Sequence, residues 1–379
     1  MKSDFQKKIG ILGGGQLGKM FLQEAYNYNA QVYILDPSAD APCAGMTKNF
    51  VCGNFKDYQT VVDFGKDLDI ITIEFEDVNS DALAYLESQG KKVYPQPSVL
   101  KIIQDKGLQK EFYTRNNIPT ASYYLVNNRE EAMQYASEAP FFQKLRTSGY
   151  DGYGVKPLKT AEDFNEAFDA PSILEKKADL EMELSVIVAR NERGEITAFP
   201  SVAMEFNPVA NMVEFLYAPA PVTEDIEKKA QSLAIEVIQK LDMIGILAVE
   251  MFVMKNGEIW VNEVAPRPHN SGHHTIEANF TSQFEMHFRS ITNLPLGNTG
   301  LIMPAVMLNL LGDPNYSGPA VYEGLEEAMQ EGNVYVHLYG KSQTKPYRKM
   351  GHVTILAYTL DEAKQRAKLL KSSLRVISE

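Results

Sequence analysis

The sequence predicts an α/β and α+β protein of two or three domains that begins with a Rossmann-like parallel sheet. Three observations lead to this prediction. A strand, a glycine-rich turn, a helix and a second strand follow one another within residues 8–36, which is the order of a βαβ unit. Two apolar runs flank Asn256-Gly257, the strongest short signal for a β-hairpin. The chain has 379 residues, 44% of them hydrophobic, enough for a large core.

Composition excludes several classes of protein. A net charge of −12 argues against a nucleic-acid-binding surface. The apolar stretches are too short for a transmembrane helix, and the N-terminus lacks the apolar core of a signal peptide. Cys43 and Cys52 are the only cysteines, too few for a disulfide framework or a zinc site. We therefore expect a soluble cytoplasmic enzyme with small-molecule substrates and neither nucleic-acid nor membrane partners.

The N-terminal segment carries a glycine turn between a strand and a helix. Residues 8–12 and 31–35 are expected to be strands, and residues 19–28 a helix. The turn at residues 13–18 matches G-x-G-x-x-G, and Asp36 follows about 20 positions later, which is typical of dinucleotide binding. Physically, the turn only lets an anionic group approach the start of a helix. A phosphorylated metabolite would satisfy it equally well.

Charged residues follow in the next two elements. A predicted strand at residues 70–73 leads into residues 74–77, Glu-Phe-Glu-Asp. These acids would lie at the carboxyl edge of a parallel sheet, where such folds bind ligands, although a solvated loop is an equal alternative. A helical pattern over residues 98–116 carries Lys106 and Lys110. Lysines on helices are usually solvated, so alone they predict no site.

The segment around residues 139–157 predicts phosphate binding. A strand at residues 141–145 carries Lys144, and residues 148–154 follow as Ser-Gly-Tyr-Asp-Gly-Tyr-Gly. Three glycines in six residues make a loop whose amides can close over phosphates, with Lys144 as the charged partner. The alternative, a plain hairpin turn, would leave Lys144 and Asp151 unexplained. The loop is not a Walker A motif.

The next elements carry weaker signals. Residues 172–178 are expected to form a strand and a connector whose backbone could meet an adenine edge, and Glu183 could hold ribose hydroxyls. Residues 184–189 follow as another strand. Residues 223–241 form an amphipathic pattern whose apolar stripe predicts a helix that packs on the core.

The hairpin around Asn256-Gly257 predicts a metal site. A two-residue type I′ loop at these positions determines which residues face one another. The pairs in this register are Met254 with Ile259, Phe252 with Val261, and Glu250 with Glu263. Two carboxylates directly opposite, roughly 4.5–5.5 Å apart at Cβ, need a cation or a shared proton between them. Oxygen ligands suit Mg²⁺, usually completed by water and phosphates; the alternative is a solvated sheet face.

Glu263 leads into residues 266–273, Pro-Arg-Pro-His-Asn-Ser-Gly-His. A guanidinium, an amide, a hydroxyl and imidazoles in so short a segment are typical of an anion-handling site. Together with the carboxylate pair, the segment predicts a metal–phosphate centre.

Beyond residue 300 the chain is expected to form a small α+β cap. Short strands are predicted at residues 305–310, 333–339 and 352–358, and a last helix at 360–373. Glycine and proline separate these elements. His337 is interpreted as a sheet residue rather than a ligand.

With these segments in order, the chain resembles the ATP-grasp enzymes, and more closely the branch that carboxylates an aminoimidazole ribonucleotide in purine biosynthesis. The motifs run in family order from residue 9 to about residue 352. They are GGGQLGKM, DKGLQKEF, KLRTSGYDGYG, Glu175 with Glu183, GILAVEMFV, VNEVAPRPHNSGHHT, SQFEMHFRSITNLPLG and RKMGH. NEVAPRPHNSGH and GYDG together are specific, whereas the glycine turn alone is not.

The resemblance implies an ATP-grasp fold and a division into domains. It implies a Rossmann-like domain at residues 1–98 and an ATP-grasp domain at 99–298, with a mobile lid at about 118–180. A small C-terminal α+β domain would occupy residues 299–379.

The resemblance also implies that ATP lies between two antiparallel sheets. The phosphates would meet Lys106 and Lys144 under the loop, the adenine the connector, and the ribose Glu183. Magnesium, or manganese in its place, would bind Glu250 and Glu263. The residues assigned to ATP are Lys106, Lys144, Gly149, Tyr150, Asp151, Gly152, Tyr153, Gly154, Val155, Glu175, Lys176, Lys177, Ala178, Glu183, Asn262 and Glu263.

The second implied ligand is the aminoimidazole ribonucleotide, whose phosphate needs cations. The residues assigned to it are Gln16, Leu17, Glu74, Tyr150, Asp151, His269, Asn270, Ser271, Lys341, Arg348 and Lys349. The basic cluster at 341–349 stands out in an acidic chain, and this assignment gives it a role.

The implied reaction is stepwise. Bicarbonate attacks the γ-phosphate of ATP, giving carboxyphosphate and ADP, and this intermediate or CO₂ released from it carboxylates the exocyclic amine. Lys144 and Arg267 would neutralise charge, and Asp151 would orient the amine or take its proton. The resemblance further implies a homodimer whose product passes to a separate mutase.

Some positions depart from the family pattern, and other functions stay open. Tyr153 and Val155 stand where a basic residue and a glutamine are common, and Phe206 where a histidine is common. A related ATP-grasp ligase acting on another carboxylate and amine is the main alternative. An NAD-dependent dehydrogenase would rest only on the glycine turn and Asp36. A non-catalytic nucleotide-binding module would predict the loss of a metal carboxylate or a phosphate lysine.

Overall fold

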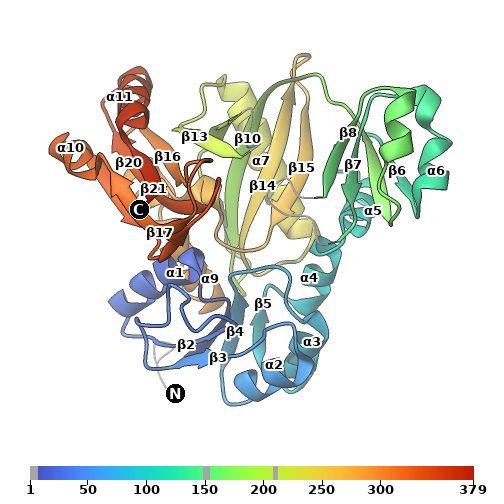
Figure 1. Ribbon diagram of the computed structural model, residues 1–379. Coiled ribbons are helices and arrows are strands. Elements are labelled where there is room, and N and C mark those ends of the chain that lie inside the picture. The colour runs from blue at the N-terminus through green and yellow to red at the C-terminus, as the bar shows by residue number, and fades with distance from the viewer. Residues whose placement is uncertain (1–6, 148–153, 208–211) are drawn as a thin grey trace.

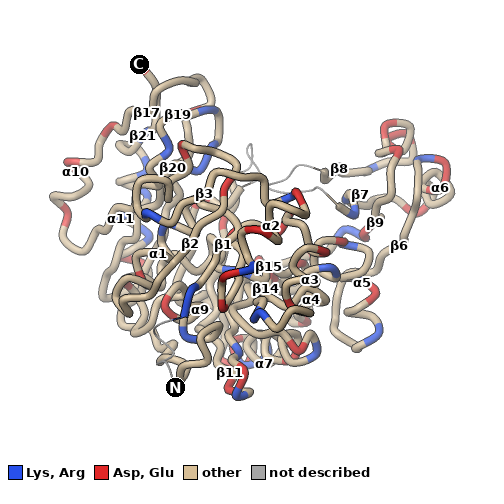
Figure 2. The backbone as a smooth tube through the Cα atoms, turned by 90° about the horizontal axis from the view of Figure 1, so that it is seen from below, with Lys and Arg blue, Asp and Glu red and all other residues tan. Residues whose placement is uncertain are grey.

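The computed structural model describes residues 7–147, 154–207 and 212–379 (Figure 1). The predictions for Gly149, Tyr150, Asp151, Gly152 and Tyr153 therefore lie outside the described residues. In both views, a small four-stranded sheet stands to one side of the rest of the protein (Figures 1 and 2). Figure 2 shows acidic and basic residues interspersed along the chain.

The N-terminal region is a five-stranded parallel sheet in the order β3-β2-β1-β4-β5. Its strands are β1 Lys8–Leu12, β2 Gln31–Asp36, β3 Phe50–Cys52, β4 Ile70–Ile73 and β5 Lys92–Tyr94. Its helices are α1 Gln16–Asn27, α2 Tyr58–Gly65 and α3 Ser80–Ser88. One core cluster joins the sheet to α1 and to the distant α9 (Gln283–Ile291), and another joins it to α2 and α3. The Rossmann-like sheet is therefore confirmed.

The predicted helix at residues 98–116 is two helices, α4 (Pro97–Ile103) and α5 (Lys106–Arg115). The break falls at Asp105, which has an extended backbone and accepts hydrogen bonds from the backbone N–H groups of Gly107 and Leu108. An aspartate that caps the next helix competes with helix continuation, which is why the periodicity alone misled. The cap places Lys106 at the first turn of α5.

Two antiparallel sheets follow. The four-stranded sheet has the order β6-β9-β7-β8, and the nine-stranded sheet has the order β15-β14-β10-β12-β13-β16-β20-β18, with β11 paired to β10. The small sheet contains β6 Tyr123–Val126, β7 Phe141–Leu145, β8 Val155–Leu158 and β9 Ser172–Lys176, next to α6 Arg129–Met133, η2 Ala136–Glu138 and η3 Ala161–Glu166. The large sheet includes β10 Leu180–Arg190, β11 Ile196–Ala198, β12 Val202–Phe206, β13 Val213–Ala218, β14 Gly245–Met254 and β15 Ile259–Ala265. The amphipathic helix α7 (Glu224–Lys240) packs its buried stripe on this sheet.

The predicted loop of the β14–β15 hairpin is wrong. The loop has three residues, because the Met254 N–H donates to the carbonyl of Glu258 (2.8 Å) and Gly257 N–H donates back to Met254 (2.8 Å). Gly257 adopts a left-handed φ of 81°, whereas Asn256 does not share it. A turn followed by one left-handed glycine is the three-residue alternative to the type I′ loop.

The longer loop shifts the register near the turn by one residue. Met254 with Ile259 and Phe252 with Val261 are not pairs; Phe252 faces Trp260 instead. The register shifts again beyond Met251, where Asn262 is the extra residue of a β-bulge. The bulge restores the predicted pairing of Glu250 with Glu263. The two carboxylates are opposite each other because two deviations cancel.

The three C-terminal strands predicted from the sequence do not form a sheet of their own. β16 (Ala305–Leu311), β20 (Lys349–Leu356) and β18 (Val334–Leu338) extend the nine-stranded sheet from β13. A separate three-stranded sheet contains β17 Gly318–Glu323, β19 Gln343–Thr344 and β21 Arg375–Ser378. The remaining helices are η4 Asn270–Gly272, α8 Thr275–Ala278, α10 Leu325–Gln330 and α11 Leu360–Ser373. One continuous hydrophobic core joins β16, β17, β18, β20, β21, α10 and α11 to α7 and β14.

Two smaller points concern the whole described chain. None of its described helices is long and apolar enough to span a membrane. Cys43 is buried and Cys52 exposed, and both are free thiols.

Candidate active site

A cavity of about 670 Å³ lies where the N-terminal sheet, α5, the β14–β15 hairpin and β20 meet. Its wall contains ten of the predicted residues. They are Gln16, Leu17, Glu74, Lys106, Glu250, Glu263, Arg267, His269, Asn270 and Lys349. Gln104, Gln109 and Arg146 contribute to the same wall without having been predicted as site residues, and it also contains Glu76 from the predicted acidic segment and His273 from the predicted anion-handling segment.

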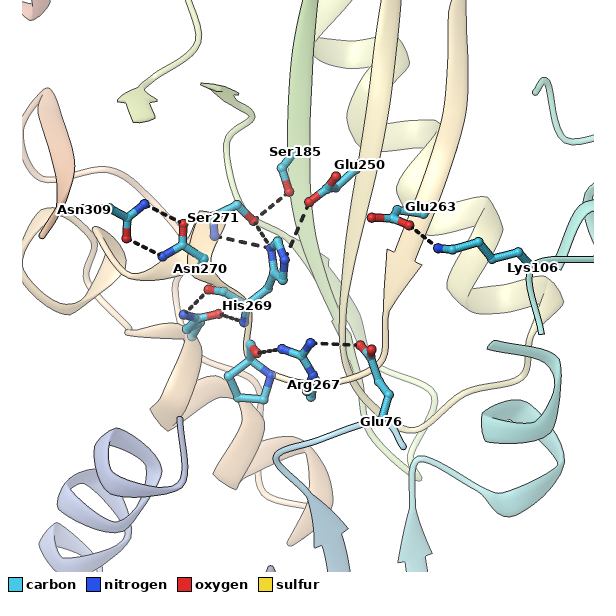
Figure 3. A network of polar contacts seen from close by, with 12 residues as sticks. Glu76, Lys106, Ser185, Glu250, Glu263, Arg267, His269, Asn270, Ser271 and Asn309 are labelled. Atoms are coloured by element: carbon cyan, nitrogen blue, oxygen red, sulfur yellow. Dashed lines mark hydrogen bonds and ion pairs between the residues drawn. The ribbon is translucent and has the colours of Figure 1, made fainter. Parts of the chain in front are cut away.

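The carboxylate pair faces this cavity from neighbouring strands (Figure 3). Lys106 Nζ donates to Glu263 Oε2 at 2.6 Å. The positive charge of Lys106 lowers the pKa of Glu263. The side chain of Glu263 is 44% exposed and lines the cavity. Burial, followed by the charges of Glu263 and Glu183, raises the pKa of Glu250. The two pKa values are therefore shifted in opposite directions, and a nearby cation would favour the charged form of Glu250.

The donor set fits a hard divalent ion that also binds phosphate. Carboxylate oxygens come from Glu250 and Glu263, and the bulge at Asn262 places an amide beside them. Within the described ranges, no group of three or more His, Cys, Asp or Glu side chains is arranged to hold a metal alone. Magnesium commonly binds through one or two carboxylates and completes its shell with water and phosphate oxygens. The pair fits that kind of site.

Three lysines gather beside the carboxylates. Lys110 Nζ donates to Glu175 Oε1 (2.7 Å) and to Thr120 Oγ1 (2.5 Å), and Lys110 is only 2% exposed. Lys144 Nζ lies 2.5 Å from Glu175 Oε2 and 3.1 Å from Asn262 Oδ1. Burial lowers the pKa of Lys110, while the lysine charges hold the pKa of Glu175 below its usual value despite burial. The cluster pairs each of these two lysines with a carboxylate oxygen of Glu175 in a mostly buried place.

The Glu175 side chain is thus an ion-pair partner of lysines. The backbone of Glu175 pairs with β6 on one side and with β7 on the other. Backbone groups that could meet a ligand therefore begin beyond Lys176. Lys176 turns toward Glu138 and lies over the Phe141 ring. Lys177 and Ala178 follow outside any strand.

Glu183 lies on β10, opposite Phe252 of β14, and does not line the main cavity. Burial is the largest cause that raises the pKa of its carboxyl, to about 7.

The glycine turn at the start of α1 is occupied by the protein's own carboxylates. Gly14 N–H donates to Asp36 Oδ2 (2.7 Å), and Leu17 N–H donates to Glu74 Oε1 (3.2 Å). A Cβ atom on Gly13 or Gly15 would lie 2.5 Å from a carboxylate oxygen of Glu74, so close approach requires glycine there. A pyrophosphate would compete with both acids for the same amides. The dehydrogenase alternative loses its only support.

The loop after β15 is held by neutral hydrogen bonds (Figure 3). Asn270 and Asn309 exchange amide hydrogen bonds of 2.8 and 3.0 Å. Ser271 Oγ lies 2.8 Å from Ser185 Oγ and 2.9 Å from His269 Nδ1. Because Ser271 N–H also donates to His269 Nδ1, the neutral ring carries its hydrogen on Nε2, which lies 3.6 Å from Glu250.

Arg267 lies at the base of this loop. Its guanidinium lies 3.1 Å from Glu76 Oε1 and donates to the carbonyl of Pro268 (Figure 3). Burial raises the pKa of Glu74, and the charge of Arg267 offsets part of that rise.

Comparison with known proteins identifies the family. Three family models match in order: the ribonucleotide synthetase preATP-grasp domain at residues 6–104, the ATP-grasp domain at 111–284, and the phosphoribosylaminoimidazole carboxylase C-terminal domain at 305–366. The N5-carboxyaminoimidazole ribonucleotide synthase of Bacillus subtilis is 38% identical over 93% of this chain and 92% of that protein. The chain belongs to this family of ATP-grasp enzymes.

Solved structures agree. The N5-carboxyaminoimidazole ribonucleotide synthetase of Thermotoga maritima has 43% identity and a TM-score of 0.92, covering 99% of this chain and 100% of that one. The synthase of Aspergillus clavatus, solved with ADP and 5-aminoimidazole ribonucleotide, has 33% identity and a TM-score of 0.89, covering 97% and 98%. The ATP-grasp fold inferred from the motifs is confirmed.

The three C-terminal cations assigned to the ribonucleotide differ in their position relative to the cavity. Lys349 lines the cavity, whereas Lys341 and Arg348 do not. Lys341 Nζ donates to the carbonyl of Lys349 (2.8 Å), and Arg348 donates to the carbonyl of Gln343 (2.6 Å). Ser271 does not line the cavity either, but its hydroxyl contacts His269, which does.

The rest of the predicted phosphate loop is only partly described. Gly154 has a φ of 77° and accepts from Leu145 N–H, and Val155 begins β8. Asp151, together with Gly149, Tyr150, Gly152 and Tyr153, belongs to the part of the chain that the structure does not describe.

Sequence reasoning passed over Lys110 and Gln283, and it named His273 only as part of the anion-handling segment without assigning it a ligand. Lys110 is four residues after Lys106 on α5, a spacing that places both on one helix face and could have predicted their joint role. Gln283 gave no such signal, because it meets the loop only through the packing of α9.

Proposed function

We propose that the protein is an ATP-dependent C–N ligase that converts 5-aminoimidazole ribonucleotide, bicarbonate and ATP into N5-carboxyaminoimidazole ribonucleotide, ADP and phosphate in purine biosynthesis. The observation that carries the proposal is one cavity lined by the carboxylate pair and Lys106 as well as by the glycine turn and Lys349, in a chain of this family. The complex of the Aspergillus clavatus synthase with ADP and the ribonucleotide supports the substrates.

ATP would bind at the lysine end of the cavity. Lys106 and Lys144 are assigned to its phosphates, residues 149–155 to covering them, residues 175–178 to the adenine and Glu183 to the ribose. Magnesium, or manganese, would be held by Glu250 and Glu263 with Asn262 nearby. When bound, the ion supplies charge neutralisation to the transferring phosphoryl group.

Bicarbonate would attack the γ-phosphate of ATP to form carboxyphosphate, which carboxylates the amine directly or through CO₂. Lys144 and Arg267 are assigned to stabilising the developing negative charge. The Arg267 guanidinium is held by Glu76 at the cavity wall, which supports that role. Asp151 is assigned to orienting the amine or accepting its proton.

The ribonucleotide would occupy the opposite end. Gln16, Leu17 and Glu74 at the glycine turn and Lys349 on β20 line the cavity there, which supports their assignment. The further residues assigned to this ligand are Tyr150, Asp151, His269, Asn270, Ser271, Lys341 and Arg348.

The setting of the enzyme is also a proposal. We assign domains to residues 1–98, 99–298 (with the lid at about 118–180) and 299–379. The family relationship supports a cytoplasmic homodimer whose product is taken up by a separate mutase, and light scattering on the purified protein tests the dimer.

The test is ADP release by purified protein with MgATP and bicarbonate, with and without the ribonucleotide. We expect strong stimulation by the ribonucleotide and an acid-labile carboxylated product. Stimulation by another amine or carboxylate instead would favour the related-ligase alternative. A folded protein without ATP turnover would favour a non-catalytic module and contradict the proposal.

A further inference from the structure

His273 lines the cavity and has no role in the function proposed above. It follows η4 and is 1% exposed. Its ring packs against three others: Phe284 at 5.8 Å between ring centroids, His352 at 4.8 Å, and Tyr339, nearly perpendicular, at 6.2 Å. A ring enclosed by three aromatic neighbours has a fixed orientation, so its nitrogen atoms have fixed directions.

Gln283 determines which nitrogen of the His273 ring carries the hydrogen. Gln283 Oε1 accepts from the backbone N–H of His269 (2.9 Å), and Gln283 Nε2 donates to the backbone carbonyl of His269 (2.8 Å). A backbone N–H only donates and a carbonyl only accepts, so this amide cannot be turned around. Gln283 Nε2 also lies 3.0 Å from His273 Nδ1 and must donate to it. The neutral His273 ring therefore carries its hydrogen on Nε2.

The ring stays neutral because of its surroundings. Burial holds the pKa of His273 well below its ordinary value, and nearby positive charges, including Lys349, lower it further. Lys349 lines the same cavity. Within the described residues, the hydrogen bond to Gln283 is the one that the His273 side chain makes. A fixed donor at the wall of a cavity needs an acceptor from water or from a ligand, and a ligand that displaces the water must supply one.

His273 belongs to the end of the cavity away from the lysine cluster. Figure 3 shows Asn270 and Ser271 on one side of His269 and Lys106 on the other. The His273 N–H donates to the carbonyl of Asn270 (3.2 Å), and the His273 ring is joined to α9 through Gln283. The ligand oxygens within its reach are therefore those of the ribonucleotide rather than those of ATP.

We propose that His273 is a substrate-binding residue whose Nε2–H donates to a phosphate oxygen of the aminoimidazole ribonucleotide, beside Lys349. The inference rests on the proposed function and adds a contact to it. Lys349 supplies charge without direction, whereas the imidazole supplies a directed hydrogen bond, and a phosphate accepts both.

The experiment measures KM for the ribonucleotide, ATP and bicarbonate in four variants. His273→Phe and His273→Met keep apolar bulk and remove the donor; His273→Gln can place an amide N–H near the position of Nε2. His274→Phe is the matched control, since His274 is next in the chain and equally buried but does not line the cavity. We expect the Phe and Met variants to raise KM for the ribonucleotide about 10–10²-fold, the value of a hydrogen bond to a charged group.

The expected pattern has further parts. KM for ATP and bicarbonate should stay unchanged, His273→Gln should recover much of the loss, and His274→Phe should behave as wild type. The inhibition constant of ribose 5-phosphate, used as a competitive inhibitor, should rise by the same factor as KM in the Phe variant. Thermal unfolding of each variant identifies any that fails to fold. If one of the Phe and Met variants does not fold, the other is used for the test.

Several outcomes would overturn the inference. A rise in KM for ATP or bicarbonate instead would place the contact on another ligand. Wild-type values for all three substrates in folded Phe or Met variants, or no recovery with His273→Gln, would reduce His273 to a packing residue. An unchanged inhibition constant for ribose 5-phosphate would remove the phosphate contact. If the ribonucleotide does not stimulate ADP release by the wild-type protein, the proposed function itself is overturned. The other outcomes overturn only the contact of His273 with the ribonucleotide.

Discussion

The two ends of the cavity hold their side chains by different means. Around α5, cations meet carboxylates: Lys106 contacts Glu263, and Glu175 is shared by Lys110 and Lys144. In the loop after β15, beyond the ion pair of Arg267 with Glu76, most contacts join uncharged groups that have a defined donor and acceptor. They are Asn270 with Asn309, His269 with Ser271, and Gln283 with His269 and His273.

The difference follows from what each end has to bind. Triphosphate and magnesium carry several charges, and a charge acts at a distance with little dependence on direction, so clustered lysines and acids suffice. A ribonucleotide has a few acceptors at set positions, and a neutral donor acts only when it points at one of them. The first end should therefore be sensitive to removal of charge, and the second to removal of orientation.

The largest effect should come from breaking the charged end at Glu263. Glu263→Gln removes one of the two carboxylates proposed for magnesium, together with the partner of Lys106. We expect magnesium-dependent ADP release to fall by at least about 10²–10³-fold with little loss of fold. Glu258→Gln, an exposed acid on the same hairpin, is the control and should retain activity. Near-wild-type turnover of Glu263→Gln at ordinary magnesium concentration would remove the two-carboxylate site.

Lys110→Met should have the next largest effect. Glu175 would then neutralise Lys144 alone and draw it from the phosphate site, so we expect kcat/KM for ATP to fall on the order of 10–10²-fold. Steady-state kinetics at saturating ribonucleotide measures this. Lys101→Met, which removes an exposed pair with Asp81, should change nothing. An unchanged kcat/KM in a folded Lys110 variant would mean that the cluster stabilises the fold without positioning Lys144.

Asn309→Leu tests the neutral end. It leaves the buried amide of Asn270 without its partner, so the free energy of unfolding should fall by about 1–3 kcal/mol. Urea denaturation measures the change. The exposed Asn315→Leu is the control and should stay within about 0.5 kcal/mol of wild type. Equal stability of the two variants would show that the amide pair contributes no net free energy.

The smallest effect concerns a buried histidine behind this end. Burial lowers the pKa of His287 to about 3, whereas its pKa in the unfolded chain is about 6.5. Below about pH 6.5 the unfolded chain therefore binds one proton more, and the free energy of unfolding falls by up to about 1.4 kcal/mol per pH unit. His287→Gln keeps a partner for Thr72 and removes this titration.

Urea denaturation of wild type and His287→Gln between about pH 7.5 and pH 4.5 measures the difference in slope. The variant should lose less stability on acidification, and the difference between the two proteins should be constant above about pH 7. Parallel curves across the whole range would show that His287 has the same pKa in the folded protein as in the unfolded chain.

The sequence by itself determined the features that depend on neighbours along the chain. Strand and helix periodicity located β1, β4, β7 and α7, and the hairpin signal brought Glu250 opposite Glu263. Even there the agreement was partly fortuitous, because the longer loop at Gly257 and the bulge at Asn262 compensate each other. The break at Asp105 was missed because a side-chain cap competes with a periodic pattern.

The tertiary structure decided which side chains meet across long sequence separations. Packing brought Glu74 into the glycine turn, so an apparent dinucleotide motif holds a carboxylate instead. It buried Lys110 against Glu175, and it merged the C-terminal strands with the central sheet. It also placed Gln283 where one amide determines the tautomer of His273. The physical reason is that local patterns specify backbone conformation, whereas burial, charge pairing and hydrogen-bond direction depend on residues that only the folded chain brings together.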